Sequence, residues 1–149
     1  GTTIFEGVSE QASATLSADG QTEGSFDGAI VVIGEDPYTE MEGDSDSLYL
    51  SETDKQTLAN VQALGIPYTV VLITGRPLIV NQEIEASDAF LVAWLPGTEG
   101  NGVSDVLFGD VAPSGKLSFS WPRSMDNVPV NYDDEGYDPL YKLGYGLTY

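Results

Sequence analysis

Three short runs of consecutive apolar residues are the feature that most restricts how this chain can fold. Residues 29–33 (AIVVI), 69–73 (TVVLI) and 89–94 (AFLVAW) are apolar at nearly every position, and the first two are rich in β-branched side chains. A strand that is apolar on both faces is typical of a parallel sheet that helices cover on both sides. The three runs therefore predict buried strands of such a sheet.

The segments between these runs carry helix signals. Residues 51–64 begin with a capping serine, have acidic residues in the first turn, and place three leucine or valine side chains on one stripe. Shorter helices are predicted within residues 3–16, 76–86 and 102–110, and a final strand at residues 116–121 (KLSFSW). Strands that alternate with helices predict an α/β fold with a mostly parallel sheet and helices on both faces, an α/β sandwich of flavodoxin-like type.

The length of the chain fits one domain that spans residues 1–149. Its last part, residues 123–149, is rich in Tyr, Asp, Pro and Gly, and we expect it to form a surface-wrapping tail. No apolar run approaches the ~20 residues that a membrane-spanning helix needs. The first residue is Gly and no targeting signal follows it, so we expect a piece of a longer protein.

The charge and two missing residue types narrow the possible functions. Twenty-four acidic residues against five basic ones give a formal charge of −19, which opposes binding to nucleic acids and to anionic membranes. Without cysteine there are no disulfides and no thiolate metal sites, and without histidine there is no Ser-His-Asp triad. Acid/base chemistry on this chain is therefore expected to use carboxyl groups.

The loop after the third apolar run carries Gly97, Gly100 and Gly102 before a predicted helix. Glycine-rich loops of this kind can bind phosphate through their amides and the positive helix end. However, Glu99 lies within the loop and would repel phosphate, and the spacing of the known phosphate-binding motifs is absent. The loop is predicted to make a tight turn from strand to helix.

The loop after the first run, residues 34–44 (GEDPYTEMEGD), gathers acidic side chains where ligands of parallel sheets bind, beyond the carboxyl ends of the strands. Its carboxyl groups are those of Glu35, Asp36, Glu40, Glu42 and Asp44. Neighbouring carboxylates raise one another's pKa, and a carboxyl that stays protonated can act as a general acid. Such a cluster could also bind calcium, or simply face solvent. The residues alone leave these three possibilities open.

Four sequence blocks resemble the C-terminal domain of glycoside hydrolase family 3 enzymes of the exo-β-glucanase and β-glucosidase type. These are GEDPYTEMEGD, LITGRPLIV, AWLPGTEGNGVSDVLFGDVAPSGKLSFSWPRS and LGYGLTY, which stand in the same order as in that family. The resemblance implies an α/β sandwich that forms one wall of a cleft, with no cofactor and no metal. The other wall would be an N-terminal barrel that carries a nucleophilic Asp. It also implies a β-glucan or β-glucoside substrate and a secreted or periplasmic protein.

The resemblance aligns Glu40 with the family's acid/base residue. Glu35 is the rival candidate, but it directly follows the strand, where loop amides or Arg76 could hold it as a structural carboxylate. Asp44 and Arg76 belong to matching blocks and are expected to brace the loops.

Three aromatic side chains, those of Tyr38, Trp94 and Trp121, could stack on a sugar, but aromatic residues near strands more often belong to the core. The family's opening strand and Trp-containing segment are missing here, as is the barrel, so the chain alone is predicted to be inactive. A non-catalytic binding module and a calcium-stabilised structural domain remain the alternatives.

Overall fold

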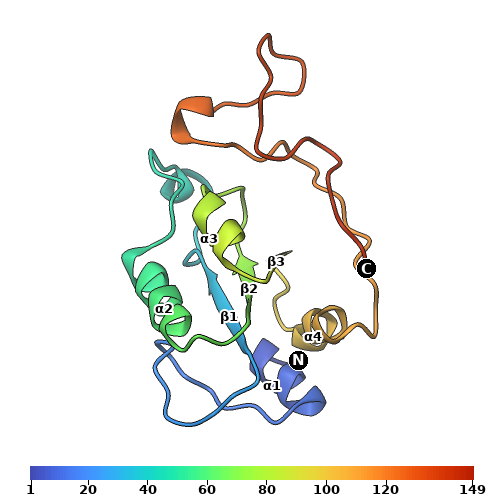
Figure 1. Cartoon of the computed structure of the whole chain (residues 1–149). Coiled ribbons are helices and arrows are strands. Elements are labelled where there is room, and N and C mark those ends of the chain that lie inside the picture. Colours follow the sequence, from blue (N-terminus) through green and yellow to red (C-terminus); the bar gives the residue numbers. More distant parts are fainter.

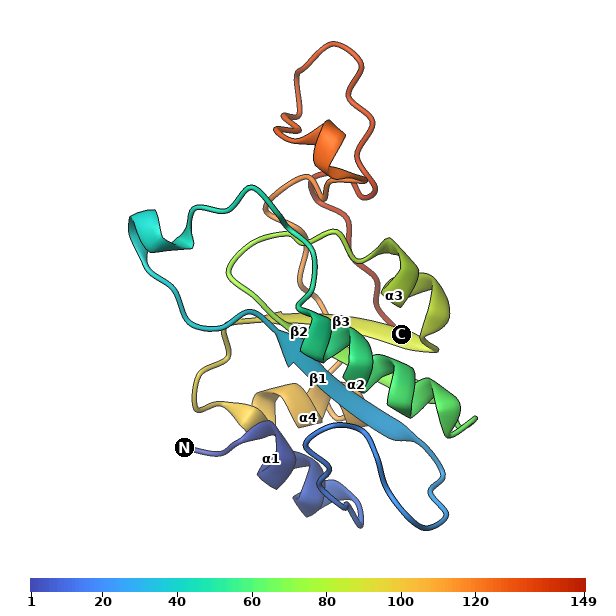
Figure 2. The ribbon, with the colours of Figure 1, turned by 90° about the vertical axis from the view of Figure 1, so that its left-hand side faces the viewer.

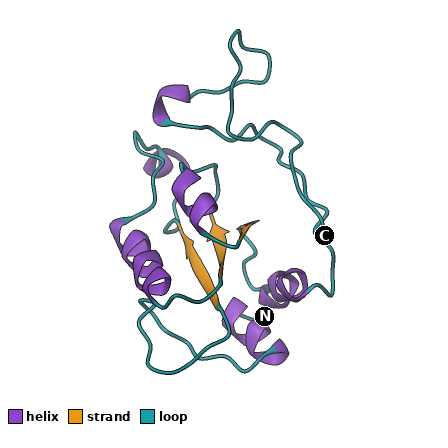
Figure 3. Cartoon of the chain, viewed as in Figure 1, coloured by secondary structure: helices purple, strands orange, loops and turns teal.

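A computed structural model describes all 149 residues and contains one three-stranded parallel sheet. The strands β1 (Ala29–Gly34), β2 (Tyr68–Ile73) and β3 (Ala89–Trp94) lie side by side in sequence order (Figures 1 and 3). The helices that connect them, α2 (Glu52–Ala63) and α3 (Asn81–Ala86), lie on one face of the sheet. On the other face α1 (Ile4–Gln11) packs against α4 (Gly100–Phe108) (Figure 2). The predicted α/β fold, with a parallel sheet between two layers of helices, is confirmed.

The core is built around the central strand. Val70, Val71 and Leu72 of β2 are fully buried, because strands flank β2 on both sides and helices cover both faces. Trp121, far along the chain, joins this core with only 2% of its surface exposed. Its indole Nε1 donates a 2.8 Å hydrogen bond to the carbonyl of Leu78. A buried indole needs such a partner, so this contact ties the C-terminal part of the chain to the sheet.

The helices begin and end at residues with identifiable roles. Ser51 caps α2, since its hydroxyl oxygen accepts a hydrogen bond from the backbone N–H of Asp54. Thr3 and Glu6 form a reciprocal capping box at the start of α1. All four helices lie within or next to the predicted segments, and α4 ends at Gly109 in the left-handed conformation.

The strand predicted at residues 116–121 is wrong. Only Trp121 takes part in a bridge, and its partner is Tyr141 in the returning tail, in antiparallel orientation. Leu117 exchanges backbone hydrogen bonds with residues 144 and 145 of the same tail segment. Of its apolar side chains Trp121 is buried, Leu117 half-buried and Phe119 53% exposed, and the backbone pairs with the tail and not with the sheet.

Two short 3₁₀ helices lie outside the sheet layers: η1 (Glu40–Gly43) in the loop after β1, and η2 (Met125–Asn127) in the tail. The first part of the tail projects from the sheet as an arm, and residues 140–145 return alongside residues 117–121 (Figure 1). The surface-wrapping role expected of residues 123–149 stays a prediction. None of the helices is long and apolar enough to span a membrane.

Candidate active site

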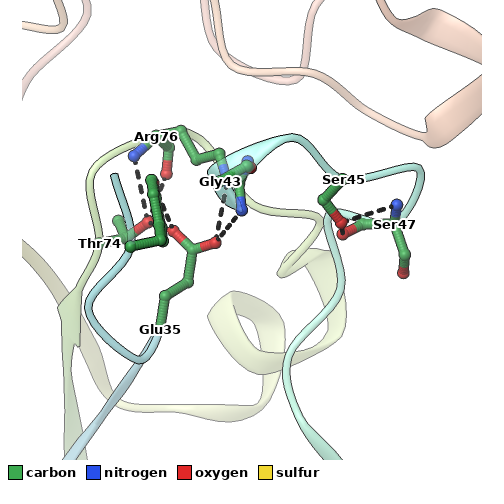
Figure 4. Close-up of polar contacts among 7 residues, drawn as sticks. Glu35, Gly43, Ser45, Ser47, Thr74 and Arg76 are labelled. Atoms are coloured by element: carbon green, nitrogen blue, oxygen red, sulfur yellow. Dashed lines mark hydrogen bonds and ion pairs between the residues drawn. The ribbon is translucent and has the colours of Figure 1, made fainter. Parts of the chain in front are cut away.

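The loop after β1 starts with a carboxylate that is held from several sides. Glu35 directly follows β1, and its backbone N–H donates to the carbonyl of Ile73 at the end of β2. Its Oε1 accepts two hydrogen bonds from Arg76, from Nε at 2.8 Å and from Nη2 at 2.7 Å (Figure 4). The two side chains are mostly buried, with 17% of Glu35 and 26% of Arg76 exposed. This ion pair joins the loop to the end of β2.

The second oxygen of the same carboxylate also has partners. The hydroxyl of buried Thr74 lies 2.6 Å from Oε2 of Glu35 and 2.7 Å from the carbonyl of Arg76. The Tyr38 hydroxyl donates to the same Oε2 at 3.1 Å. Both oxygens of Glu35 are therefore occupied, which is how a structural carboxylate is normally held.

Arg76 reaches from this carboxylate to the far end of the loop. Its Nη1 donates to the carbonyl of Gly43, the last residue of η1 (Figure 4). Its guanidinium also lies 4.5 Å from the centre of the Tyr38 ring, within the range of cation–π attraction. The bracing expected of Arg76 is thus present in the structure. For Asp44, the structure has no side-chain hydrogen bond or ion pair.

The Tyr38 ring packs against its own loop, although 37% of the residue stays exposed to solvent. Its ring faces Gly43 and its hydroxyl faces Gly75. Partial burial of the Tyr38 hydroxyl is the main cause that raises its pKa above the usual value, and the nearby negative charge of Glu35 is the second. The hydroxyl therefore stays protonated and can donate to Glu35 throughout the neutral range.

The carboxylate of Glu40, unlike that of Glu35, has no partner. It is the first residue of η1, its side chain is exposed, and none of the hydrogen bonds or ion pairs in the structure involves its carboxylate. Its φ of 27° lies in the left-handed region, which costs a non-glycine residue roughly 1–3 kcal/mol. Such a conformation persists only where the surroundings impose it, and Trp94, with a φ of 55°, is the other non-glycine residue in this region.

The tryptophans considered for sugar stacking belong to the core region. Trp121 is buried, and the half-buried ring of Trp94 packs against it with the ring centroids 6.0 Å apart. Phe119 lies on the same side, 6.1 Å from Trp94. Beyond Trp94 the chain turns into α4, where a Cβ on Gly100 would collide with the backbone of Thr3. Gly100 thus allows close packing of the chain start against α4, and Gly97, with a φ of 58°, makes the expected turn.

The structure brings Glu35, Tyr38, Gly43, Thr74 and Arg76 together into one polar cluster, which we call the loop brace. The sequence suggested contact between Glu35 and Arg76, but it gave no signal for the Thr74 hydroxyl or the Gly43 carbonyl. Both partners depend on how the loop folds back over the end of β2. Three or more acidic side chains nowhere gather in an arrangement that could hold a metal ion.

Known proteins similar to this chain carry named activities. The model of the "Glycosyl hydrolase family 3 C-terminal domain" matches residues 1–149. A periplasmic beta-glucosidase of Salmonella typhimurium is 36% identical over 83% of the chain, and a beta-xylosidase of Formosa agariphila is 34% identical over 97%.

A solved structure, that of a point mutant of the exo-1,3/1,4-beta-glucanase ExoP from a Pseudoalteromonas species, is 46% identical. It covers 97% of this chain with a TM-score of 0.89. The chain spans about a fifth of the two enzymes named above, 19% and 21%, and 26% of the ExoP chain.

Proposed function

Because the chain belongs to glycosyl hydrolase family 3, as a C-terminal domain, we propose that it supplies the general acid/base carboxyl of a larger enzyme. The enzyme is a retaining, exo-acting β-glucosidase or β-glucanase, and the carboxyl is that of Glu40. The observation that carries the proposal is the contrast between two glutamates of one loop. Both oxygens of Glu35 are engaged by the loop brace, so neither can give a proton to a leaving group. Glu40 is exposed and unengaged at the outer turn of the loop.

The second carboxyl group of the reaction is proposed to lie on another domain. Retaining glycosidases place two carboxyl groups ~5–5.5 Å apart, one as nucleophile and one as acid/base. Glu40 and its loop neighbours project from a single edge of this domain, and a sugar must fit between the two groups. An Asp on an N-terminal barrel that faces this loop would meet the requirement. The chain alone is then expected to leave aryl β-glucosides intact.

The reaction then proceeds in two steps. Glu40 first protonates the glycosidic oxygen as the barrel Asp attacks the anomeric carbon, the C–O bond breaks, and a glycosyl-enzyme forms. Glu40, now ionised, next takes a proton from water as the water oxygen attacks the anomeric carbon. The bond from this carbon to the barrel Asp breaks, the sugar is released, and Glu40 returns to its protonated form. A β-linked glucan or glucoside is the proposed substrate because of the likeness to the exo-glucanase, and the periplasmic relative supports a periplasmic or extracellular location.

The test is kinetic and is made in the full-length enzyme with Glu40→Ala. Loss of the acid should lower kcat/KM sharply for a glucose disaccharide, whose leaving group needs protonation, but little for dinitrophenyl β-glucoside, whose leaving group does not. Turnover of the activated substrate should stall at the glycosyl-enzyme. Azide should restore it and yield a β-glycosyl azide, because this anion needs no general base.

Two variants serve as controls. Glu35→Ala should reduce stability and lower kcat/KM for both substrates to a similar extent, without azide rescue. Glu42→Ala removes a neighbouring exposed carboxyl of η1 and should leave the kinetics unchanged. An azide-rescued, leaving-group-selective loss in Glu35→Ala, with none in Glu40→Ala, would reverse the two roles and refute the proposal.

A further inference from the structure

We propose that Tyr38 is a positioning residue for Glu40. Its ring lies between Gly43 and Gly75, and we call it the wedge because it fixes the position of the η1 turn relative to the sheet. The inference rests on the proposed role of Glu40 as acid/base. Tyr38 does not touch the substrate or the Glu40 carboxyl. It acts on the short turn that carries Glu40.

Three groups surround the space that the Tyr38 ring occupies, which we call its seat: Gly43, Gly75 and the Arg76 guanidinium. A Cβ on Gly43 would collide with Cδ2 of the ring, and a Cβ on Gly75 would lie 2.8 Å from the Tyr38 hydroxyl. The Arg76 guanidinium covers the ring at 4.5 Å. Side chains do not approach a Cβ this closely, so only glycine at both positions leaves room for the ring. Gly43 is on the turn and Gly75 follows β2, so the ring spans the gap between the turn and the sheet.

The link from the wedge to Glu40 is short and stiff. The turn η1 has four residues and begins at Glu40 and ends at Gly43. The N–H of Gly43 donates to the carbonyl of Thr39 at 3.1 Å, and the N–H of Asp44 donates to Met41. Arg76 holds the Gly43 carbonyl from the other side. A shift of Gly43 would therefore carry Glu40 with it.

The backbone of Glu40 also needs this support. Its left-handed φ of 27° is unfavourable for a glutamate, and the Glu40 side chain has no hydrogen bond that would compensate for it. The contacts that hold the turn are those of Tyr38 and Arg76 with Gly43. A displacement of about 1 Å in a catalytic group can lower a rate ~10²-fold, so small changes around the Tyr38 ring should lower the rate of the step that Glu40 catalyses.

The geometry predicts that one glycine substitution can be rescued and the other cannot. In Gly75→Ala the new methyl group meets the Tyr38 hydroxyl, while the ring carbon Cζ lies at an ordinary 3.5 Å. Adding Tyr38→Phe removes that hydroxyl and should reopen the seat. In Gly43→Ala the new methyl group meets the ring carbons Cδ2 and Cε2 themselves. Phenylalanine has the same ring, so Tyr38→Phe should not rescue this variant.

The experiment compares these variants in the full-length enzyme with the same two substrates, a glucose disaccharide and dinitrophenyl β-glucoside. Gly75→Ala is expected to lower kcat/KM for the disaccharide by roughly 10- to 100-fold, with a much smaller change for the activated glucoside, because a displaced acid fails where protonation is needed. The double variant with Tyr38→Phe should recover most of the loss. Gly43→Ala should show the same selective loss with or without Tyr38→Phe.

Two matched substitutions control for general effects. Tyr49→Ala removes an exposed tyrosine near the end of the same connection, outside the loop brace, and Gly102→Ala adds a methyl group where no atom lies within 4 Å. Both should leave the ratio of the two kcat/KM values unchanged. If a glycine variant does not fold, Tyr38→Leu empties the seat without a clash and should give the selective loss by itself.

The outcomes separate this inference from the proposal beneath it. If Glu40→Ala shows the leaving-group-selective loss and Gly75→Ala and Tyr38→Leu do not, Glu40 is the acid but Tyr38 does not position it. Equal losses of kcat/KM on both substrates in Gly75→Ala would also overturn the inference about Tyr38, as would rescue of Gly43→Ala by Tyr38→Phe. If Glu40→Ala itself lacks the selective loss, the proposed function fails and the inference fails with it.

Discussion

At the scale of single residues, the sequence suggested one partner of Glu35 but not the rest of the cluster around it. A carboxylate directly after a strand, with one arginine after the next strand, suggested that Glu35 would be held, and the structure has this ion pair. The packing of the Tyr38 ring against the loop could not be read from the sequence. It depends on two glycines far apart along the chain, Gly43 and Gly75, that come together only when the loop folds over β2.

The Glu35–Arg76 pair should be measurable in the stability of the domain. Glu35→Gln removes the charge and leaves a mostly buried guanidinium without its counter-ion. The free energy of unfolding should fall by about 1.5–3 kcal/mol, the usual range for a hydrogen bond to a charged group. Urea unfolding of the chain measures this change.

A surface ion pair provides the control for that measurement. Glu52→Gln breaks the contact with Lys55, in which 89% of the Glu52 side chain is exposed. Exposed pairs contribute little because water and salt screen them. No measurable change is expected, and an equal loss in the two variants would mean that the Glu35 pair does not brace the loop.

At the scale of helices and strands, local patterns predicted most of the elements. Each strand was marked by its own apolar run, and α2 by its cap and stripe, because these elements satisfy their backbone groups locally or within a predictable sheet. The burial expected of all three strands holds for the centre of β2, whereas β1 and β3, at the sheet edges, are only partly buried. The strand predicted at residues 116–121 is absent because a short apolar-rich segment does not identify its own pairing partner. Here the partner is the tail segment around Tyr141, which lies well beyond the predicted strand along the chain.

The cap of α2 makes a prediction at this scale. Ser51→Ala removes the oxygen that accepts from the Asp54 N–H, and the free energy of unfolding should fall by about 1 kcal/mol. Ser13→Ala, at an exposed position outside the helices with no side-chain hydrogen bond, should change it little. Thermal melting compares the two, and equal melting temperatures would argue against the cap.

At the scale of the whole molecule, like charges dominate the surface. Against a formal charge of −19, the structure contains three ion pairs, and two of them are largely exposed. Most carboxylates therefore repel one another without local compensation. The excess of acidic groups was predictable from composition, and of the three ion pairs the sequence suggested only that of Glu35 with Arg76.

Added salt should stabilise the domain. Sodium chloride shortens the screening length from about 10 Å at 0.1 M to about 3 Å at 1 M, which weakens repulsion in the compact state. The melting temperature should rise across this range. An equal osmolality of a neutral osmolyte separates screening from solvent effects, and a flat or falling melting temperature with salt would show that the repulsion is not a net cost to the folded state.

The complete burial of three consecutive residues of β2 has a consequence for deuterium exchange. Its two neighbours, β1 and β3, are each flanked by a strand on one side only, and Val32 of β1 is 45% exposed. Amides at the sheet edges can meet heavy water through small local openings, but those of Val70, Val71 and Leu72 have no such route. Their exchange should be the slowest in the chain, at the rate set by global unfolding.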